Sequence, residues 1–508
     1  MGDIEANESA DGTESVRTRL LTFAVPDRAT LLWMSAFAVL CIVLVVTGST
    51  QRVGDGGEYV AMSYQFANLR PPAMSLWDLA DIDRHYAALG DSMATFRGSA
   101  RSEAVLLSNG RYDQLHFWIY PLLAAPFVKL THWFGVADTY GFAAMHVVLA
   151  VFTFGVVLRR KGAVAASLLF ISPLLWWIDK PHGELVVFCL LLLALLWARD
   201  RPHLGLLCLS VLAAHNMSLT TVLATYGIWL LILHGRSLFD SGRKWAALVA
   251  AVVIAGSHPV YYLVRLGAID PIRLIEVQKV RVPTVTRFIT PVLDPYAGLV
   301  MWWPALVLAA GVGAVLRAWH RPLVGRTLRE WAAVWAPFVV AMALLFAQAQ
   351  ITQPASGGTF ALTRYGVWFA PFAVFAFGHH RSTRRATQAG VVICCVASAV
   401  LSFHIARPDR PDVWFTVAPT FVSDAVNDHA PWLWNPVPQI FLTREHGQYT
   451  PIEPVANESC TKLLAVSGRW PGDCPTPTDV PSDCAASYFC YANRSGDDYF
   501  FQPVDQFG

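Results

Sequence analysis

The sequence predicts an all-α polytopic membrane protein with about 11 transmembrane helices and a small disulfide-containing C-terminal domain outside the cytoplasm. Three observations lead to this prediction. Of the 508 residues, 55% are hydrophobic and only 15% are charged, and the mean hydropathy is +0.43, whereas soluble domains carry about 25% charged residues. Apolar runs long enough to cross a bilayer recur along most of the chain. Four cysteines gather in its polar C-terminal part.

The first elements are a polar leader and one membrane helix. Residues 1–28 are rich in polar side chains and carry Arg28 directly before the apolar run, so we expect a disordered cytoplasmic segment. Residues 29–48 are long enough to span about 30 Å of hydrocarbon at 1.5 Å per residue. A cleaved signal peptide would have an apolar region of only about 7–15 residues. We therefore expect a retained first helix that begins a membrane domain over residues 29–403.

Residues 50–137 are predicted to form one large external loop. Charged residues are frequent between 70 and 115, and such residues must lie outside the hydrocarbon. Residues 112–134 are apolar but are interrupted by Pro121 and Pro126. An interfacial or re-entrant helix fits that pattern better than a full crossing.

The remaining crossings follow the apolar runs and the placement of basic residues. Residues 204–233 contain His215 and Asn216 in the middle, so we interpret this run as two short helices joined by an outward turn, with one tilted helix as the alternative. The other expected crossings are residues 140–158, 162–178, 185–198, 245–264, 299–316, 331–347, 365–378 and 388–403.

One external segment, residues 265–297, departs from the tendency of basic residues to lie inside. Its five cations are Arg265, Arg273, Lys279, Arg281 and Arg287. Either the topology is inverted there, or these cations act on the outer face. Binding of an anionic lipid headgroup would be such an action.

The cysteines divide into two groups. Five lie in apolar runs, and four lie in the polar C-terminal domain, residues 404–508: Cys460, Cys474, Cys484 and Cys490. Four cysteines in such a segment predict two disulfides with three alternative connectivities, and hence an oxidising compartment. A zinc site is the alternative, but no CxxC pair is present. We therefore place the C-terminal domain outside the cytoplasm.

The motif GDGGEY, residues 54–59, follows the first helix directly. Its carboxylates, Asp55 and Glu58, are three residues apart and share one face if the segment is helical. The glycines allow a tight bend where the chain leaves the bilayer. The motif therefore presents two acids beside the membrane, although a solvated loop is an alternative interpretation.

Other polar groups are predicted to reach the same external surface. They are the turn DKPHGE at residues 179–184, the basic loop, and Arg364 at the start of a late apolar run. His116, His182 and His215 lie near the same face by topology. Their convergence, more than any single residue, indicates a functional site.

In their order along the chain and in the membrane face on which they are expected, these motifs resemble those of the GT-C superfamily of polyprenyl-phosphate-sugar-dependent glycosyltransferases. The resemblance is to the protein O-mannosyltransferase and aminoarabinose transferase-like branch in particular. The matching stretches are GDGGEY, HFWIYPLLAAPFVKLTHWFG, LRRKG, DKPHGE and the Thr363-Arg364-Tyr365 motif. The chain lacks the adjacent Asp-Glu pair that is commoner in the first motif, and it has Glu184 where many relatives have Asp. These departures leave the sugar and the acceptor open.

The resemblance implies an integral enzyme of the bacterial plasma membrane that takes part in cell-envelope assembly. It would transfer a hexose or pentose from a polyprenyl-phosphate donor to a glycan, lipid or protein acceptor on the extracytoplasmic face. A single displacement at C1 would invert the anomeric centre.

Chemistry then assigns roles to the residues. Asp55 is the candidate general base, a role that contributes about 10²–10⁴-fold, with Glu58 and Glu184 as orienting or acceptor-binding acids. Cations are needed for the leaving phosphate, and the candidates are Arg364, Arg281 and Lys279. Substrate contacts are expected from His182, His116 and Tyr59. Asp55 and Glu184, with Glu58 and Asp179, also offer the oxygen ligands that Mg²⁺ or Mn²⁺ prefers, and metal dependence stays open.

Two other classes of protein remain as alternatives. A transporter or flippase of lipid-linked sugars would hold paired ionisable groups at mid-membrane, whereas these charges cluster at predicted helix ends. A non-enzymatic cell-envelope assembly protein would use the C-terminal domain as a binding module. With a net charge of +2, no basic tail and no nucleic-acid motif, the sequence does not indicate a nucleic-acid partner.

Overall fold

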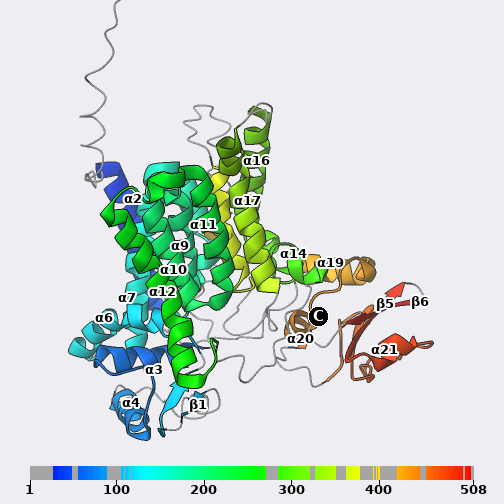
Figure 1. Cartoon of the computed structure of the whole chain (residues 1–508). Helices are drawn as coiled ribbons and strands as arrows, with labels where there is room; N and C mark the ends of the chain where they lie inside the picture. Colours follow the sequence, from blue (N-terminus) through cyan, green and yellow to red (C-terminus); the bar gives the residue numbers. More distant parts are fainter. Residues whose placement is uncertain are drawn as a thin grey trace, which may run out of the picture.

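The protein has a mostly helical body and a smaller C-terminal part built on a four-stranded sheet (Figure 1). The computed structural model describes residues 27–48, 55–88, 104–107, 109–114, 116–270, 284–320, 327–349, 362–377, 420–446, 453–495 and 498–504, with a few single positions between 393 and 400. The statements below concern these residues.

The body is a bundle of apolar helices that run side by side (Figure 1). Its main members are α2 (Arg28–Thr47), α7 (Asp138–Lys161), α9 (Glu184–Trp197), α10 (Pro202–His215), α11 (Thr220–His234) and α12 (Gly242–Leu266). Helix α9 packs against α7 and α10, and every side chain in it except Leu190 is buried. A helix that is apolar on all sides belongs in the middle of a bundle. Helix α9 is therefore the central element of the core.

The predicted external loop is folded and has a core of its own. It contains α3 (Gly56–Ala67), α4 (Leu76–Ala88), α6 (Ile119–Phe134) and the paired strands β1 (Ala104–Leu106) and β2 (Tyr112–Gln114). Helices α3 and α6 pack on each other across the end of the bundle (Figure 1). The expected helix over 112–134 begins only at Ile119, because residues 112–114 pair as a strand.

Several predicted crossings are interrupted. Residues 162–178 form α8 (Ala163–Phe170) and the short 3-10 helix η1 (Pro173–Trp177), separated where the Ser172 hydroxyl caps η1. Residues 204–233 divide at Asn216, as predicted for this run, with η2 (Met217–Leu219) between α10 and α11. A further 3-10 turn, η3 (Gly235–Leu238), follows α11.

The expected crossing at 365–378 is a 3-10 helix, η4 (Gly366–Phe375). At about 2.0 Å per residue its 10 residues cover roughly 20 Å, short of the hydrocarbon thickness of about 30 Å. Pro371 lies inside it and removes a backbone donor that an α-helix would use. Such a segment is tolerated at membrane depth only where protein covers it, and η4 is packed on α9.

Four described helical segments are long and apolar enough to cross a membrane: Arg28–Thr47, Asp138–Lys161, Met217–Leu238 and Gly242–Leu266. Five others are apolar but shorter, among them α9 with 14 residues. The chain is therefore equipped to associate with a membrane, but the predicted 11 crossings are not confirmed. The predicted crossing at 388–403 lies almost entirely outside the described residues.

The second half of the body contains α14 (Val285–Leu293), α15 (Leu299–Trp302), α16 (Pro304–His320) and α17 (Leu328–Ala349). In the basic loop, Arg265 places its Nε 2.7 Å from an oxygen of Asp113, and its guanidinium lies over the Tyr261 ring. This cation therefore neutralises a buried acid within the chain. Arg273, Lys279 and Arg281 lie outside the described residues.

The C-terminal part begins with α19 (Phe421–His429), η5 (Pro431–Leu433) and α20 (Pro438–His446). Its antiparallel sheet has the order β3 (Val455–Ala456), β4 (Lys462–Val466), β5 (Phe489–Ser495) and β6 (Asp498–Val504), with α21 (Ser482–Ala486) before β5. In register, Leu464 faces Tyr491 and Cys490 faces Pro503. The two predicted disulfides are confirmed, and their connectivity is Cys460–Cys474 and Cys484–Cys490.

The C-terminal part is tied to the segment that precedes α15. Tyr296 and Ala297 are buried in one core cluster with Phe441 of α20 and Tyr491 of β5. The Tyr296 hydroxyl donates a hydrogen bond to Glu445 at 2.8 Å. The two parts therefore share a core at this junction.

This junction predicts a pH dependence. Burial raises the pKa of Glu445 to about 7, and the charges of Asp424, Glu458 and Asp428 add to the rise. Because the folded pKa lies above the unfolded value, the stabilisation is present at low pH and is lost as pH rises through about 7. We expect the C-terminal part to become more susceptible to proteolysis and heat between about pH 5 and pH 8.

The matched test compares Glu445→Gln with Glu453→Gln in the full chain, since Glu453 is exposed. The C-terminal part of Glu445→Gln should be as resistant to proteolysis and heat at about pH 8 as at about pH 5. Glu453→Gln should lose resistance over this range as the wild type does. Equal pH dependence in all three proteins would contradict the assignment.

Candidate active site

Asp55 lies where α3 begins and is the centre of the candidate site. Its backbone carbonyl accepts hydrogen bonds from the amides of Glu58, at 3.1 Å, and Tyr59, at 3.2 Å, which start the helix. Glu58 is buried in the first turn, and the Asp55 side chain is 17% exposed. The motif is therefore the start of a helix and not a solvated loop, and it offers one accessible carboxylate.

Arg364 reaches this carboxylate from a position 309 residues away in the chain. Its Nη1 donates to Asp55 Oδ2 at 3.1 Å, and its Nη2 donates to the Tyr365 hydroxyl at 2.6 Å. The amide of Thr363, the residue before Arg364, donates to the Ala297 carbonyl at 2.9 Å. That bond fixes the backbone just ahead of η4 and aims the guanidinium at the start of α3.

The DKPHGE turn supplies a second pair of groups. His182 Nδ1 is hydrogen-bonded to Glu184, and both side chains are buried. His182 Nε2 lies 3.3 Å from Arg364 Nη1 and 3.7 Å from Asp55 Oδ2. Glu184 Oε1 lies 3.8 Å from Arg364 Nε. The turn therefore places one imidazole and one acid against the arginine.

His116 connects the two acids of the first motif. Its Nε2 is 3.3 Å from Asp55 Oδ2, and its Nδ1 is 3.0 Å from Glu58 Oε1. The Tyr59 ring lies edge-on to the rings of both His116 and His182, with centroids 6.0 Å apart in each case. The structure thus gathers all the predicted site residues that it describes.

The electrostatics favour an ionised Asp55. Burial alone would raise its pKa, but the charges of His116, Arg364 and His182 outweigh that effect and hold the pKa of Asp55 well below its usual range. The site therefore presents an anionic carboxylate beside a cationic guanidinium, with the imidazoles of His116 and His182 next to the carboxylate.

Gly183 allows the turn to pack closely. A Cβ at this position would lie 2.2 Å from His215 Nε2, so only glycine lets the His215 ring rest against the backbone. His215 Nδ1 and Glu58 Oε2 are buried and have no hydrogen-bond partner among the described residues. Buried polar atoms without partners are costly unless a ligand satisfies them. Both atoms are therefore candidates for substrate contacts.

A small cavity adjoins the site at Tyr365. Its other lining residues are Arg287, Thr290, Pro291, Gln348, Ala349, Thr363 and Val437. Arg287 belongs to the basic loop that was predicted to serve the outer face. Arg287 therefore lines the same cavity as Thr363 and Tyr365, the residues on either side of Arg364.

The carboxylates that the sequence offered as ligands for Mg²⁺ or Mn²⁺ are not arranged as a metal site. Asp55 and Glu184 each face Arg364 and His182, so a guanidinium occupies the space between them. Asp179 forms a buried ion pair with Lys180 at 2.7 Å. In the described part of the chain, the residues named for that metal do not bring three ligand atoms together.

Two of the predicted phosphate-binding cations, Arg281 and Lys279, lie outside the described residues. The structure also adds groups that sequence reasoning had not assigned. Tyr365 holds the second arm of Arg364, and its adjacency to that residue was the available signal. Tyr120, whose ring packs edge-on to Tyr59 at 5.1 Å, lies in the stretch that resembled a family motif but had no role assigned to it.

No protein-family model, curated protein or solved structure matches the chain.

Proposed function

We propose that this chain is an integral membrane glycosyltransferase that moves a sugar from a polyprenyl-phosphate donor to an acceptor hydroxyl on the extracytoplasmic face. The observation that carries the proposal is the 3.1 Å contact between Asp55 and Arg364. The contact joins a carboxylate and a guanidinium, which are the groups that suit a general base and a phosphate site, and this supports the proposal.

The reaction needs one proton acceptor and one stabilised leaving group. Asp55 takes the proton of the acceptor hydroxyl while the acceptor oxygen forms a bond to C1 of the sugar. The bond between C1 and the phosphate oxygen breaks, and its electron pair stays on the polyprenyl phosphate. Attack opposite the leaving group inverts the anomeric centre. General-base assistance of this kind typically contributes about 10²–10⁴-fold.

Arg364 serves the leaving group. A guanidinium matches phosphate oxygens with paired N–H donors, and here one arm is already held by Tyr365. An arriving donor phosphate competes with Asp55 for Nη1. As that contact weakens, the pKa of Asp55 rises toward its ordinary value. Donor binding therefore makes Asp55 a stronger base at the moment when the acceptor is deprotonated.

The other side chains have supporting roles. Glu184 holds His182 through Nδ1, so His182 is oriented with Nε2 toward Asp55 and Arg364. His116 contacts Asp55 through Nε2 and Glu58 through Nδ1, and thereby holds the two carboxylates in position. The Tyr59 ring is buried among these groups and packs edge-on to both imidazoles, so its role is to hold them in place.

The surroundings agree with a lipid-linked donor. Helix α9, which carries Glu184, and η4, which follows Arg364, are apolar, and this suits a polyprenyl chain lying in the bilayer beside them. The disulfides of the C-terminal part favour an oxidising compartment, and this part shares a core with Tyr296, near the Arg364 segment. Both features support placing the site on the extracytoplasmic side.

The test is a transfer assay with the purified full-length protein in proteoliposomes. A panel of radiolabelled polyprenyl-phosphate sugars would be supplied with candidate glycan, lipid and peptide acceptors. We expect one donor to yield a product whose anomeric configuration is opposite to that of the donor. Movement of lipid-linked sugar across the bilayer without any product would identify a flippase and overturn the proposal.

A further inference from the structure

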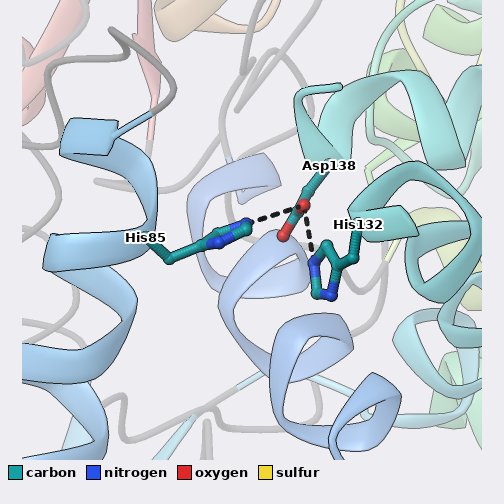
Figure 2. A group of neighbouring side chains, drawn as sticks. All are labelled: His85, His132 and Asp138. Carbon is teal, nitrogen blue, oxygen red and sulfur yellow. Dashed lines mark hydrogen bonds and ion pairs between the residues drawn. The ribbon is translucent and has the colours of Figure 1, made fainter. Parts of the chain in front are cut away.

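A second cluster of ligating side chains lies outside the candidate active site. It consists of His85 from α4, His132 from α6 and Asp138 from α7 (Figure 2). Asp138 Oδ1 is 3.2 Å from His85 Nε2 and 2.9 Å from His132 Nε2. His132 and Asp138 are only six residues apart, on consecutive helices, whereas His85 comes from a helix 53 residues before Asp138. Each residue contributes one ligand atom to the cluster.

The cluster has the composition of a metal site. Its three ligand atoms all lie within 4.8 Å of one another. Asp138 is fully buried, and the side chains of His132 and His85 are 12% and 23% exposed, so one side stays open to solvent. Two imidazoles and one carboxylate form a mixed nitrogen and oxygen set, which transition metals prefer and which Mg²⁺ and Ca²⁺ do not.

The shell around the cluster orients its acid. The Tyr86 hydroxyl donates to Asp138 Oδ2 at 2.8 Å, which leaves Oδ1 directed at the two histidines. Outer hydrogen bonds of this kind commonly hold metal-ligating carboxylates in place. The buried Asp138 carboxylate is therefore surrounded by one hydroxyl and two imidazole nitrogens.

We propose that His85, His132 and Asp138 bind one divalent transition-metal ion of the Zn²⁺ class, with water completing the coordination from the open side. Small movements of the two rings away from Oδ1 would replace the present hydrogen bonds by bonds of about 2.0–2.2 Å to the ion. The ion would then cross-link α4, α6 and α7.

This cross-link would also support the helix that carries the acids of the candidate active site. Tyr64 lies on α3, six residues after Glu58, and its ring centroid is 4.9 Å from that of His85 and 5.4 Å from that of His132. The metal would therefore brace α3 from its far end. Metal content and stability can be measured whether or not the chain transfers a sugar.

The test uses the full-length protein purified in detergent, stripped with a chelator and reloaded with Zn²⁺. We expect about one more equivalent of bound zinc, measured by mass spectrometry of the metal, in the wild type than in His132→Gln or His85→Gln. We also expect Zn²⁺ to raise the thermal midpoint of the wild type by several degrees but not that of the variants. Co²⁺ in place of Zn²⁺ should give a visible d–d absorption band that the variants lack.

Two controls separate this site from others. His429→Gln, at an exposed histidine of α19, should keep the zinc and the thermal shift. Glu58→Gln should keep them too, because Glu58 belongs to the other cluster. The proposal is overturned if the wild type and both ligand variants hold equal zinc, or if Zn²⁺ stabilises them equally. Since His85 is partly exposed, its variant should fold even if His132→Gln does not.

Discussion

Replacing Asp55 by asparagine is expected to lower the rate of sugar transfer by about 10²–10⁴-fold. The amide keeps nearly the same shape and can still accept a hydrogen bond from Arg364, but it cannot take the acceptor proton. Donor binding should change much less, because the phosphate is held by Arg364 and not by Asp55. Single-turnover kinetics with a saturating donor would measure the chemical step directly.

The matched control for this experiment is Asp240→Asn. Asp240 also pairs with a cation, Lys244 at 2.7 Å, but its side chain is 54% exposed and it belongs to a turn before α12. An exposed ion pair of this kind contributes little, so both transfer and stability should be unchanged. If the wild type transfers sugar and Asp55→Asn transfers it equally fast, Asp55 is not the base and the mechanism is wrong.

The second large effect is expected from Arg364→Lys. Lysine keeps the positive charge but loses the fork that reaches Asp55 and Tyr365 at the same time. The loss of one charge-assisted hydrogen bond costs about 1.5–3 kcal/mol, which corresponds to a roughly 10- to 150-fold rise in the KM for the donor. Inhibition by free polyprenyl phosphate should weaken by a similar factor.

The control here is Arg265→Lys. Arg265 is a second arginine paired with a carboxylate, and this substitution removes its guanidinium in the same way. Arg265 neutralises Asp113, which is not among the groups gathered around Asp55. Its replacement should therefore leave the KM for the donor unchanged, whatever it does to stability. A donor KM that rises in Arg265→Lys but not in Arg364→Lys would move the phosphate site to the basic loop.

Much of the candidate site followed from the order of motifs along the chain. Asp55 comes directly after the first apolar run and Glu184 directly before a later one, so alternating crossings place both at the same side. Arg364 was placed there by the same rule. The crossing count was less predictable, because a run such as 365–378 has the composition of a membrane helix but contains Pro371 and folds as a 3-10 helix.

Other relationships had no signal in the sequence. His85 and Asp138 are 53 residues apart with no metal-binding spacing between them. Nothing in the sequence pairs Arg265 of the basic loop with an acid. In the structure its Nε donates to Asp113, which lies 152 residues earlier in the chain. The four C-terminal cysteines allowed three pairings, and the packing of the sheet and its loops selected one.

The sequence by itself determined that the protein is mostly helical with helices apolar enough to associate with a membrane, and which chemical groups lie near the ends of those helices. Both depend on local quantities, namely the apolar content of each run and the charges at its ends. Only the tertiary structure decided that Arg364 faces Asp55, that His116 joins Asp55 to Glu58, and that several apolar runs are too short to span a membrane alone. These outcomes depend on packing between distant segments and on the breaks in each helix, which composition does not record.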